Sequence, residues 1–473
     1  MTAASIRARP GVLAKCIAGC LVSAGAPLCV AGTDSVLNCS DGGSGSLRAT
    51  IAAAASGDIV VLNPVTMKCS SITLTAGEIA ISQSDLYIKY NAANSNRFTI
   101  SGNYSTTNIH ARVFHHTGAG KLKLQRLNIV NGGWSTNDTT ASVLGGCVDS
   151  SGVVDLESST ISGCTLSARL GLSFFVRGAG VYAAKGIALN HSTIHANIAY
   201  NFYSTSGAYR GASVEGAGAF ANNYISAHYS TVSDNAAYSV ADNSGGGGIF
   251  VNNSDPNSAS TIEQCTISGN SALRGGGLSA VNFAGGFAIG NSTISGNYSF
   301  EHDKTDTAPY TRGSAIFSLG TLTISNSTVA FNDAPTAASP AIFFGKSNYN
   351  VRVVSTIVAN NTAAGMPYDV SSRFPLTIVG ANDLIPTKSS TIAFTFPPLT
   401  ADPLLLPLAD NGGPTQTQAF RTASPAFNGG NNAANFATDQ RGTGFSRQAA
   451  NTDVDIGAYQ DQVRDRIFAD GFD

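Results

Sequence analysis

The sequence predicts an all-β fold, a parallel β-helix (solenoid) whose first coil is covered by a short N-terminal helix. Three observations predict it: one five-residue phrase recurs nine times, a glycine-rich phrase lies between many of the copies, and apolar residues alternate with period two ahead of many of them. Charged residues make up 12 % of the 473 residues and hydrophobic residues 43 %, so the chain has apolar surface to bury and should fold.

The recurring phrase is a threonine, a branched apolar residue, two small residues and usually an asparagine, as in Thr266–Asn270. Copies start at residues 99, 128, 160, 193, 231, 266, 293, 328 and 356. Their mean spacing is about 32 residues and uneven, which places the differences in length in loops. A β-propeller is the alternative, but it needs four antiparallel strands per blade and gives no reason for a recurring asparagine.

Each copy indicates a short strand with one buried face. In six copies, apolar residues or alanine stand five and seven positions before the aliphatic residue of the phrase, as Leu122 and Leu124 do before Ile129. The glycine-rich phrase, as in Gly246–Ile249, introduces another strand. Each coil is therefore expected to contain several short strands.

One asparagine per coil is expected to stand in a vertical ladder. Its amide can hydrogen-bond to the asparagine one coil away, and asparagine tolerates the left-handed bend expected between strands. The predicted ladder consists of Asn197, Asn235, Asn270, Asn297, Asn332 and Asn360.

Residues 1–31 have the layout of a secretory signal peptide. Arg7, Arg9 and Lys15 precede an apolar run that ends in small residues near Ala31. Ile17–Cys20 also has the form of a lipoprotein cleavage box, so lipidation remains an alternative. No later stretch has the ~18 uninterrupted apolar residues of a membrane helix, so no transmembrane span is expected after signal removal.

The remaining chain divides into four parts. Residues 35–98 are expected to form the N-terminal cap and first coils, with a helix over Ser46–Ala55 and a strand over Asp58–Leu62. The β-helix repeats occupy 99–373, and C-terminal coils occupy 374–460. Residues 461–473 form a tail with either a sorting role or no ordered role.

Export allows disulfides. The pairs Cys39 with Cys69 and Cys147 with Cys164 are predicted, which leaves Cys265 unpaired; buried reduced cysteines are the alternative.

The two phrases together resemble right-handed β-helix proteins of the pectate-lyase-like superfamily and the repeats of polymorphic outer-membrane proteins. The stretches Leu408–Thr415, Thr438–Gly442 and Asp455–Tyr459 are similar to bacterial choice-of-anchor Q domain proteins. Leu47–Ile51 resembles the N-terminal motif of that group, although its cysteine is displaced to Cys39 and its glutamate is absent. The resemblance implies a single-stranded right-handed β-helix in a secreted or cell-surface protein, without a family-wide catalytic mechanism.

Nucleic acid is not an expected partner, because the net charge of −2 leaves no polycationic surface. No metal site and no cofactor are predicted. Polysaccharide-cleaving enzymes need converging carboxylates, and no acid recurs in one strand column on consecutive copies. The sequence does not favour one oligomeric state over another.

Insertions that follow the asparagine column should leave the rod at one corner. They contain tyrosines and arginines suited to sugar binding, although these side chains could instead cover the rod. The candidate ligand-binding residues are Tyr200, Tyr203, Tyr209, Arg210, Tyr238, Tyr298, Tyr310 and Arg312. Glu301 and Asp303 are the acid pair to test as an active site.

A second aromatic column, separate from the tyrosines of the insertions, is expected two residues after the third position of the glycine phrase. We expect its rings to pack against one another rather than to bind sugar. Its members are Tyr182, Phe220, Phe250, Phe317 and Phe343.

The favoured function is a non-enzymatic, adhesin-like exported protein whose insertion face binds polysaccharide or cell-surface glycans. The alternatives are a polysaccharide lyase or glycoside hydrolase with an atypical site on the insertion loops, and a purely structural spacer.

Overall fold

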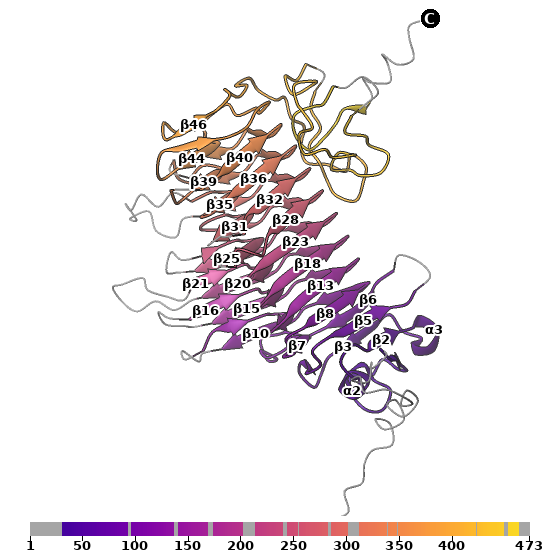
Figure 1. Cartoon of the computed structure of the whole chain (residues 1–473). Helices are drawn as coiled ribbons and strands as arrows, with labels where there is room; N and C mark the ends of the chain where they lie inside the picture. The colour runs from indigo at the N-terminus through magenta and orange to yellow at the C-terminus, as the bar shows by residue number, and fades with distance from the viewer. Residues whose placement is uncertain are drawn as a thin grey trace, which may run out of the picture.

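The computed structural model describes residues 31–92, 96–136, 141–168, 174–201, 213–239, 244–253, 255–281, 285–300, 312–337, 339–347, 349–421, 423–448 and 453–462. The chain winds into a rod of stacked coils, and each coil adds one strand to each of several long parallel sheets (Figure 1). The predicted parallel β-helix is therefore confirmed.

Sheet A is the first long sheet of the rod. Its strands, in order, are β1 (Thr33–Val36), β2 (Ile59–Leu62), β5 (Leu86–Tyr90), β8 (Lys121–Gln125), β13 (Val153–Glu157), β18 (Gly186–Asn190), β23 (Tyr224–His228), β28 (Ser260–Glu263), β32 (Phe287–Gly290), β36 (Leu322–Ser325) and β40 (Val351–Val354).

Sheet B contains the threonine phrase. Its strands are β3 (Ser71–Thr73), β6 (Phe98–Ser101), β9 (Leu127–Val130), β14 (Thr160–Ser162), β19 (Thr193–His195), β24 (Thr231–Ser233), β29 (Thr266–Ser268), β33 (Thr293–Ser295), β37 (Thr328–Ala330) and β41 (Ile357–Ala359).

Sheet C follows the glycine phrase. Its strands are β4 (Ile79–Ile81), β7 (Phe114–His116), β12 (Val148–Ser150), β17 (Val181–Ala183), β22 (Ala219–Ala221), β27 (Ile249–Asn252), β31 (Leu278–Val281), β35 (Ile316–Ser318), β39 (Ile342–Phe344) and β44 (Val370–Ser372).

Two further sheets lie between sheets B and C in the course of a coil. Sheet D consists of β10 (Gly133–Thr136), β15 (Thr165–Ala168), β20 (Ile198–Asn201), β25 (Ala236–Ser239), β30 (Ser271–Ala272), β34 (Tyr298–Ser299), β38 (Asp333–Ala334), β42 (Thr362–Ala363) and β43 (Met366–Pro367). Sheet E consists of β11 (Val143–Leu144), β16 (Phe175–Arg177), β21 (Ser213–Glu215) and β26 (Ser244–Gly245). A final pair joins β45 (Leu376–Ile378) and β46 (Ile392–Phe394).

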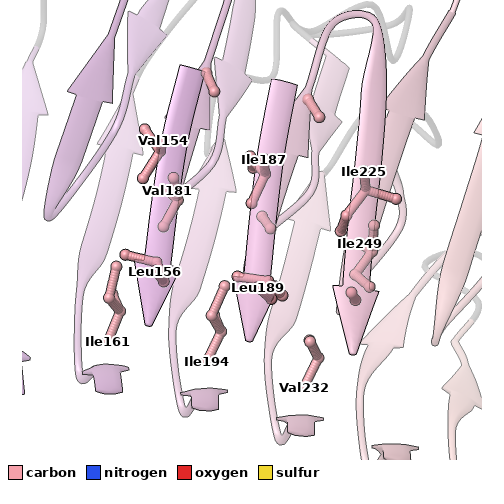
Figure 2. Close-up of a cluster of buried hydrophobic side chains, with 14 of the residues drawn as sticks. Val154, Leu156, Ile161, Val181, Ile187, Leu189, Ile194, Ile225, Val232 and Ile249 are labelled. Atoms are coloured by element: carbon pink, nitrogen blue, oxygen red, sulfur yellow. The ribbon is translucent and has the colours of Figure 1, made fainter. Parts of the chain in front are cut away.

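The interior of the rod is a stack of aliphatic side chains from sheets A, B and C. Figure 2 shows Val154, Ile187 and Ile225 from neighbouring coils side by side in one row, from left to right, with Ile161, Ile194 and Val232 in a second row below. The alternation of apolar residues in the sequence places these side chains on the inner face of each strand. This burial is the main favourable contribution to folding.

The predicted cap is helix α2 (Leu47–Ala53), whose Leu47 and Ile51 are buried in the first coils. Ser46 caps the helix by accepting a hydrogen bond from the backbone N–H of Ala49. A second short helix, α3 (Pro64–Met67), follows β2. Among the described residues, no helix is long and apolar enough to cross a membrane.

The asparagine ladder occupies the bend between sheets B and D. The Nδ2 of Asn235 donates to the Oδ1 of Asn270 at 2.9 Å, and Asn270 donates to Asn297 at 3.0 Å. The same contact joins Asn197 to Asn235 and Asn297 to Asn332. All of these side chains are buried, so the ladder satisfies polar groups inside the fold.

The prediction of Asn360 in this ladder is wrong. Asn332 donates to Oδ1 of Asn361, at 2.9 Å, and Asn361 donates in turn to Asp369. The reason is register: Thr328 pairs with Ile357 rather than with Thr356, which moves the last copy of the phrase by one residue.

The left-handed bend also falls one residue earlier than predicted. Residues with positive φ precede the ladder asparagines, among them Asp234 (56°), Gly269 (65°) and Asn360 (58°). The ladder asparagines themselves serve as hydrogen-bonding side chains.

Two disulfides join neighbouring coils. Cys39 is bonded to Cys69, and Cys147 is bonded to Cys164 in the core. Cys265 is a buried free thiol, and burial raises its pKa to about 12. Disulfides are consistent with an extracellular protein.

Residues 400–421, 423–448 and 453–462 fold back beside the later coils, where Figure 1 shows them in orange to yellow. Thr266 donates to the carbonyl of Gln416, Thr293 donates to the side chain of Gln440, and the backbone N–H of Ala458 donates to Thr328. This C-terminal segment therefore covers the outer side of sheet B.

Candidate functional site

The insertion corner is a two-layer extension of the rod built from sheets D and E. Leu166, Ala199 and Ala237 from sheet D pack against Val176 and Val214 from sheet E in a second small core. Because strand side chains alternate, the neighbouring residues of both sheets point outward. The extension thus has two outer faces with different chemistry.

The outer face of sheet D carries exposed aromatic side chains, and we call it the aromatic face. Tyr200 and Tyr238 are in direct register on adjacent strands, and the ring of Tyr238 lies 4.9 Å from that of Phe300. Tyr238 is 45 % exposed, and Tyr298, which pairs with Ser271 in the adjoining column, is 38 % exposed. The structure therefore brings together three of the predicted ligand residues.

Hydroxyl groups continue this face toward the N-terminus. Ser135 and Ser167 occupy the same column as Tyr200, and the Oγ of Ser167 donates to the Oγ of Ser135 at 2.6 Å. Burial raises the pKa of Tyr104, whose hydroxyl lies beside Tyr200 and these two serines. Ser167 is buried, with 5 % of its surface exposed, so the open part of this face is the aromatic part around Tyr238 and Tyr298.

The other predicted site residues lie elsewhere. Arg312 is buried, with 4 % of its surface exposed, and so is not part of the aromatic face. Outside the described residues are Tyr203, Tyr209, Arg210, Tyr310, Glu301 and Asp303.

The second aromatic column lies on the outer face of sheet C, directed away from the core, and is nevertheless packed. Tyr182, Phe220 and Phe250 stack with centroids 5.4 Å apart, and Phe317 stacks on Phe343 at 5.9 Å. The guanidinium of Arg177 lies 4.5 Å from the ring of Phe220, which is fully buried. Since their faces are covered, most of these rings cannot receive a sugar.

A charged cluster continues this column toward the N-terminus, and sequence reasoning missed it. His115 and Asp149 are in register with Tyr182. Glu78 immediately precedes strand β4, and Arg112 lies two residues before strand β7. Asp149 directly follows the glycine phrase Gly145–Val148, so extending the aromatic column by one coil in the sequence would have identified it.

The four side chains pair with one another. Arg112 Nη1 is 2.5 Å from Glu78 Oε2, and Arg112 Nη2 is 3.7 Å from Asp149 Oδ2. His115 Nδ1 is 2.9 Å from Glu78 Oε1. Burial raises the pKa of Asp149, while Arg112 and His115 oppose that shift.

Arg112 is also fixed from behind. Its Nε and Nη2 donate to the carbonyls of Gly145 and Leu144, and its guanidinium lies 4.6 Å from the centre of the Trp134 ring. A cluster of two carboxylates, a guanidinium and an imidazole can bind a polar ligand or transfer protons. It can equally serve as a structural ion-pair network.

A small pocket of about 180 Å³ lies farther along, where sheet E meets sheet C. Glu215 lines it from sheet E, as does Arg274, which pairs with Gly245 of β26 through an isolated bridge; Phe250, Ser279 and Phe317 line it from sheet C. The Glu215 carboxylate bonds Arg177 at 2.7 Å and Ser213 at 2.8 Å. Among the described residues, no group of three or more His, Cys, Asp or Glu side chains is arranged to hold a metal ion.

No protein-family model matches the chain, and no curated protein matches its sequence. Among solved structures, the crystal structure of pectate lyase Pel9A is similar at 12 % sequence identity. The match covers 91 % of this chain and 97 % of that one, with a TM-score of 0.45. A likeness of this size assigns no activity to the chain.

Proposed function

We propose that the chain is an exported β-helix protein, displayed at the cell surface, that binds glycans on the aromatic face without cleaving them. The register of Tyr200 with Tyr238 on adjacent strands, together with the contact between the Tyr238 and Phe300 rings, supports this most directly. A tyrosine ring offers an apolar surface to a sugar ring and a hydroxyl to its polar edge.

The extent of the face favours an extended ligand. Neighbouring coils are separated by about 4.8 Å, so side chains on successive coils form a continuous line along the rod. Ser135, Ser167, Tyr200 and Tyr238 form such a line. A glycan chain laid along it would contact several coils at once, and weak contacts would add up.

Export and surface display rest on the signal-like segment 1–31 and the likeness to choice-of-anchor Q domain proteins. The two disulfides agree with an oxidising compartment. The motif residues Gln440 and Arg441 hold the C-terminal segment together and against the rod, so we assign them a structural role.

The test is a glycan array probed with the mature chain and with Tyr238→Ala. We expect the bound glycans to lose affinity by about tenfold in the variant, since one stacked ring contributes roughly 1–2 kcal/mol. Tyr349→Ala, which removes a tyrosine outside sheet D, is the matched control. Array binding that is identical in wild type and Tyr238→Ala would exclude the aromatic face.

A polysaccharide lyase or glycoside hydrolase is the second candidate, and the Glu78–Asp149 cluster is the observation that favours it. Soluble-sugar release or unsaturated products from a panel of uronic-acid polymers would support it. Glu78→Gln should then abolish turnover if the cluster is catalytic. Loss of turnover in Glu301→Gln instead would place the chemistry on the insertion loops.

A further inference from the structure

A column of left-handed turn residues runs along the corner between sheets A and B. Each turn places one residue at positive φ and points its side chain out of the rod. The column consists of Arg126, Ser158, His191, Tyr229, Gln264, Asn291, Asn326 and Ser355, with φ between 44° and 55°. Backbone hydrogen bonds stack the turns, as from Arg126 N–H to the carbonyl of Glu157.

The later half of this column binds the C-terminal segment of the chain. Gln264 Nε2 donates to the carbonyl of Asp439 at 2.8 Å, and Asn291 Nδ2 donates to that of Thr438 at 2.9 Å. Asn326 Nδ2 donates to the carbonyl of Asn431, also at 2.9 Å. Neutral amides at these positions thus hold the oxygen atoms of a polypeptide.

The earlier half of the column has different chemistry and borders an open pocket of about 300 Å³. Arg97, Arg126, His191, Tyr229 and Thr231 line the pocket, and Pro414 of the C-terminal segment closes one side. This volume is at the lower end of the range for small-molecule sites. At the equivalent turn positions of these earlier coils, cationic and aromatic side chains replace the amides that bind the neutral backbone in the later coils.

The cationic groups are held in place by the fold. Arg97 Nε donates to the carbonyl of Ser158 at 2.6 Å, and Arg126 Nη1 donates to that of Ala92 at 2.8 Å. The nine described residues that line the pocket include no carboxylate. The Glu157 carboxylate interacts electrostatically with Arg126, but it forms its ion pair with Lys123, at 2.5 Å.

The aromatic groups add ring surface. The rings of His191 and Tyr229 lie 4.9 Å apart and are tilted by 41°, and the ring of His228 lies 4.0 Å from that of Tyr229. Two guanidinium groups recognise an oxyanion well, while aromatic rings and hydroxyls suit a sugar ring.

We propose that this pocket binds a saccharide unit that carries an oxyanion, either a carboxylate or a sulfate. Arg97 and Arg126 bind the oxyanion, and His191 and Tyr229 contact the sugar ring. The site is separate from the aromatic face and does not depend on glycan binding there.

Isothermal titration of the mature chain tests the proposal with glucuronate, glucose 6-sulfate, glucose, acetate and inorganic sulfate. We expect at least one of the two anionic sugars to bind about tenfold or more tightly than glucose, and than its own free anion. The tighter of the two identifies the oxyanion. The assignment would be overturned if the anionic sugar bound no more tightly than glucose, or no more tightly than its own free anion, acetate or sulfate.

The variants locate the site. Arg97→Gln and, separately, His191→Ala should weaken the anionic sugar by about tenfold, whereas the exposed cation variant Arg373→Gln should not. His191 is exposed, so its variant should fold even if Arg97→Gln does not. Tyr238→Ala should leave this affinity unchanged, which separates the pocket from the proposed function. Unchanged affinity in both pocket variants would refute the site.

Discussion

The side chain of Asn270 accepts a hydrogen bond from Asn235 Nδ2 at 2.9 Å and donates one to Asn297 Oδ1 at 3.0 Å, although 35 and 27 positions separate the partners. Its Oδ1 also accepts the backbone N–H of Asn235, and its Nδ2 also donates to the carbonyl of Val232. One amide therefore satisfies buried groups in two neighbouring coils.

Substitution of Asn270 by alanine should be strongly destabilising. It leaves buried donors and acceptors without partners, and we expect a loss of about 2–4 kcal/mol in the free energy of unfolding. Denaturant titration of the mature chain measures it. Asn350→Ala, at an exposed position outside the ladder, should cost less than about 0.5 kcal/mol, and equal losses would contradict a special role for the ladder.

Removal of the inner disulfide should also destabilise the rod. Cys147 and Cys164 are 17 residues apart, and a loop of that length corresponds to about 3 kcal/mol. The double variant Cys147→Ala with Cys164→Ala should therefore unfold at lower denaturant concentration. Reducing agent should lower the denaturant concentration at which the wild type unfolds, and should lower that of the double variant less. An equal decrease in both would show that this bond contributes little.

The repeat made the coils predictable, because the buried positions alternate and the phrase marks the same bend each time. Register was harder. Asn360 and Asn361 are adjacent, and only the pairing of Thr328 with Ile357 decides which enters the ladder.

The charged cluster was missed for a related reason. Glu78, Arg112 and Asp149 are far apart in the sequence and differ in type, so no column of like residues marks them. Stacking of β4, β7 and β12 brings them together. The pocket beside Arg97 and Arg126 was likewise not predictable, since Pro414 reaches it only through the folded-back C-terminal segment.

Stability should depend on pH through Asp383. Burial raises the pKa of this carboxyl from 3.8 to about 8, so the folded chain holds a proton that the unfolded chain releases between these values. The contribution of this group to the free energy of unfolding is therefore fully present below about pH 4 and is lost as the pH rises to about 8.

Asp383→Asn isolates that contribution, because the amide oxygen can still accept the hydrogen bond from the N–H of Thr356. We expect the free energy of unfolding of the wild type, compared with the variant, to fall between pH 4 and pH 8. Denaturant titrations at several pH values give the two curves, and parallel curves would mean that Asp383 is ionised in the fold.

Gln440 should control the docking of the C-terminal segment. Its Nε2 donates to the carbonyl of Cys265 and to Thr266 Oγ1, and its Oε1 accepts from Thr293 Oγ1 at 2.6 Å. Gln440→Ala leaves the buried Thr293 hydroxyl without its acceptor and removes the contacts to Cys265 and Thr266, at a cost of about 1–3 kcal/mol. Limited proteolysis should then cut within residues 400–462 faster than in the wild type, while the coils stay intact.

The control is Gln462→Ala, because the contacts described for this side chain are only to carbonyls of the segment itself. Cleavage at equal rates in wild type and Gln440→Ala would show that other contacts hold the segment on sheet B.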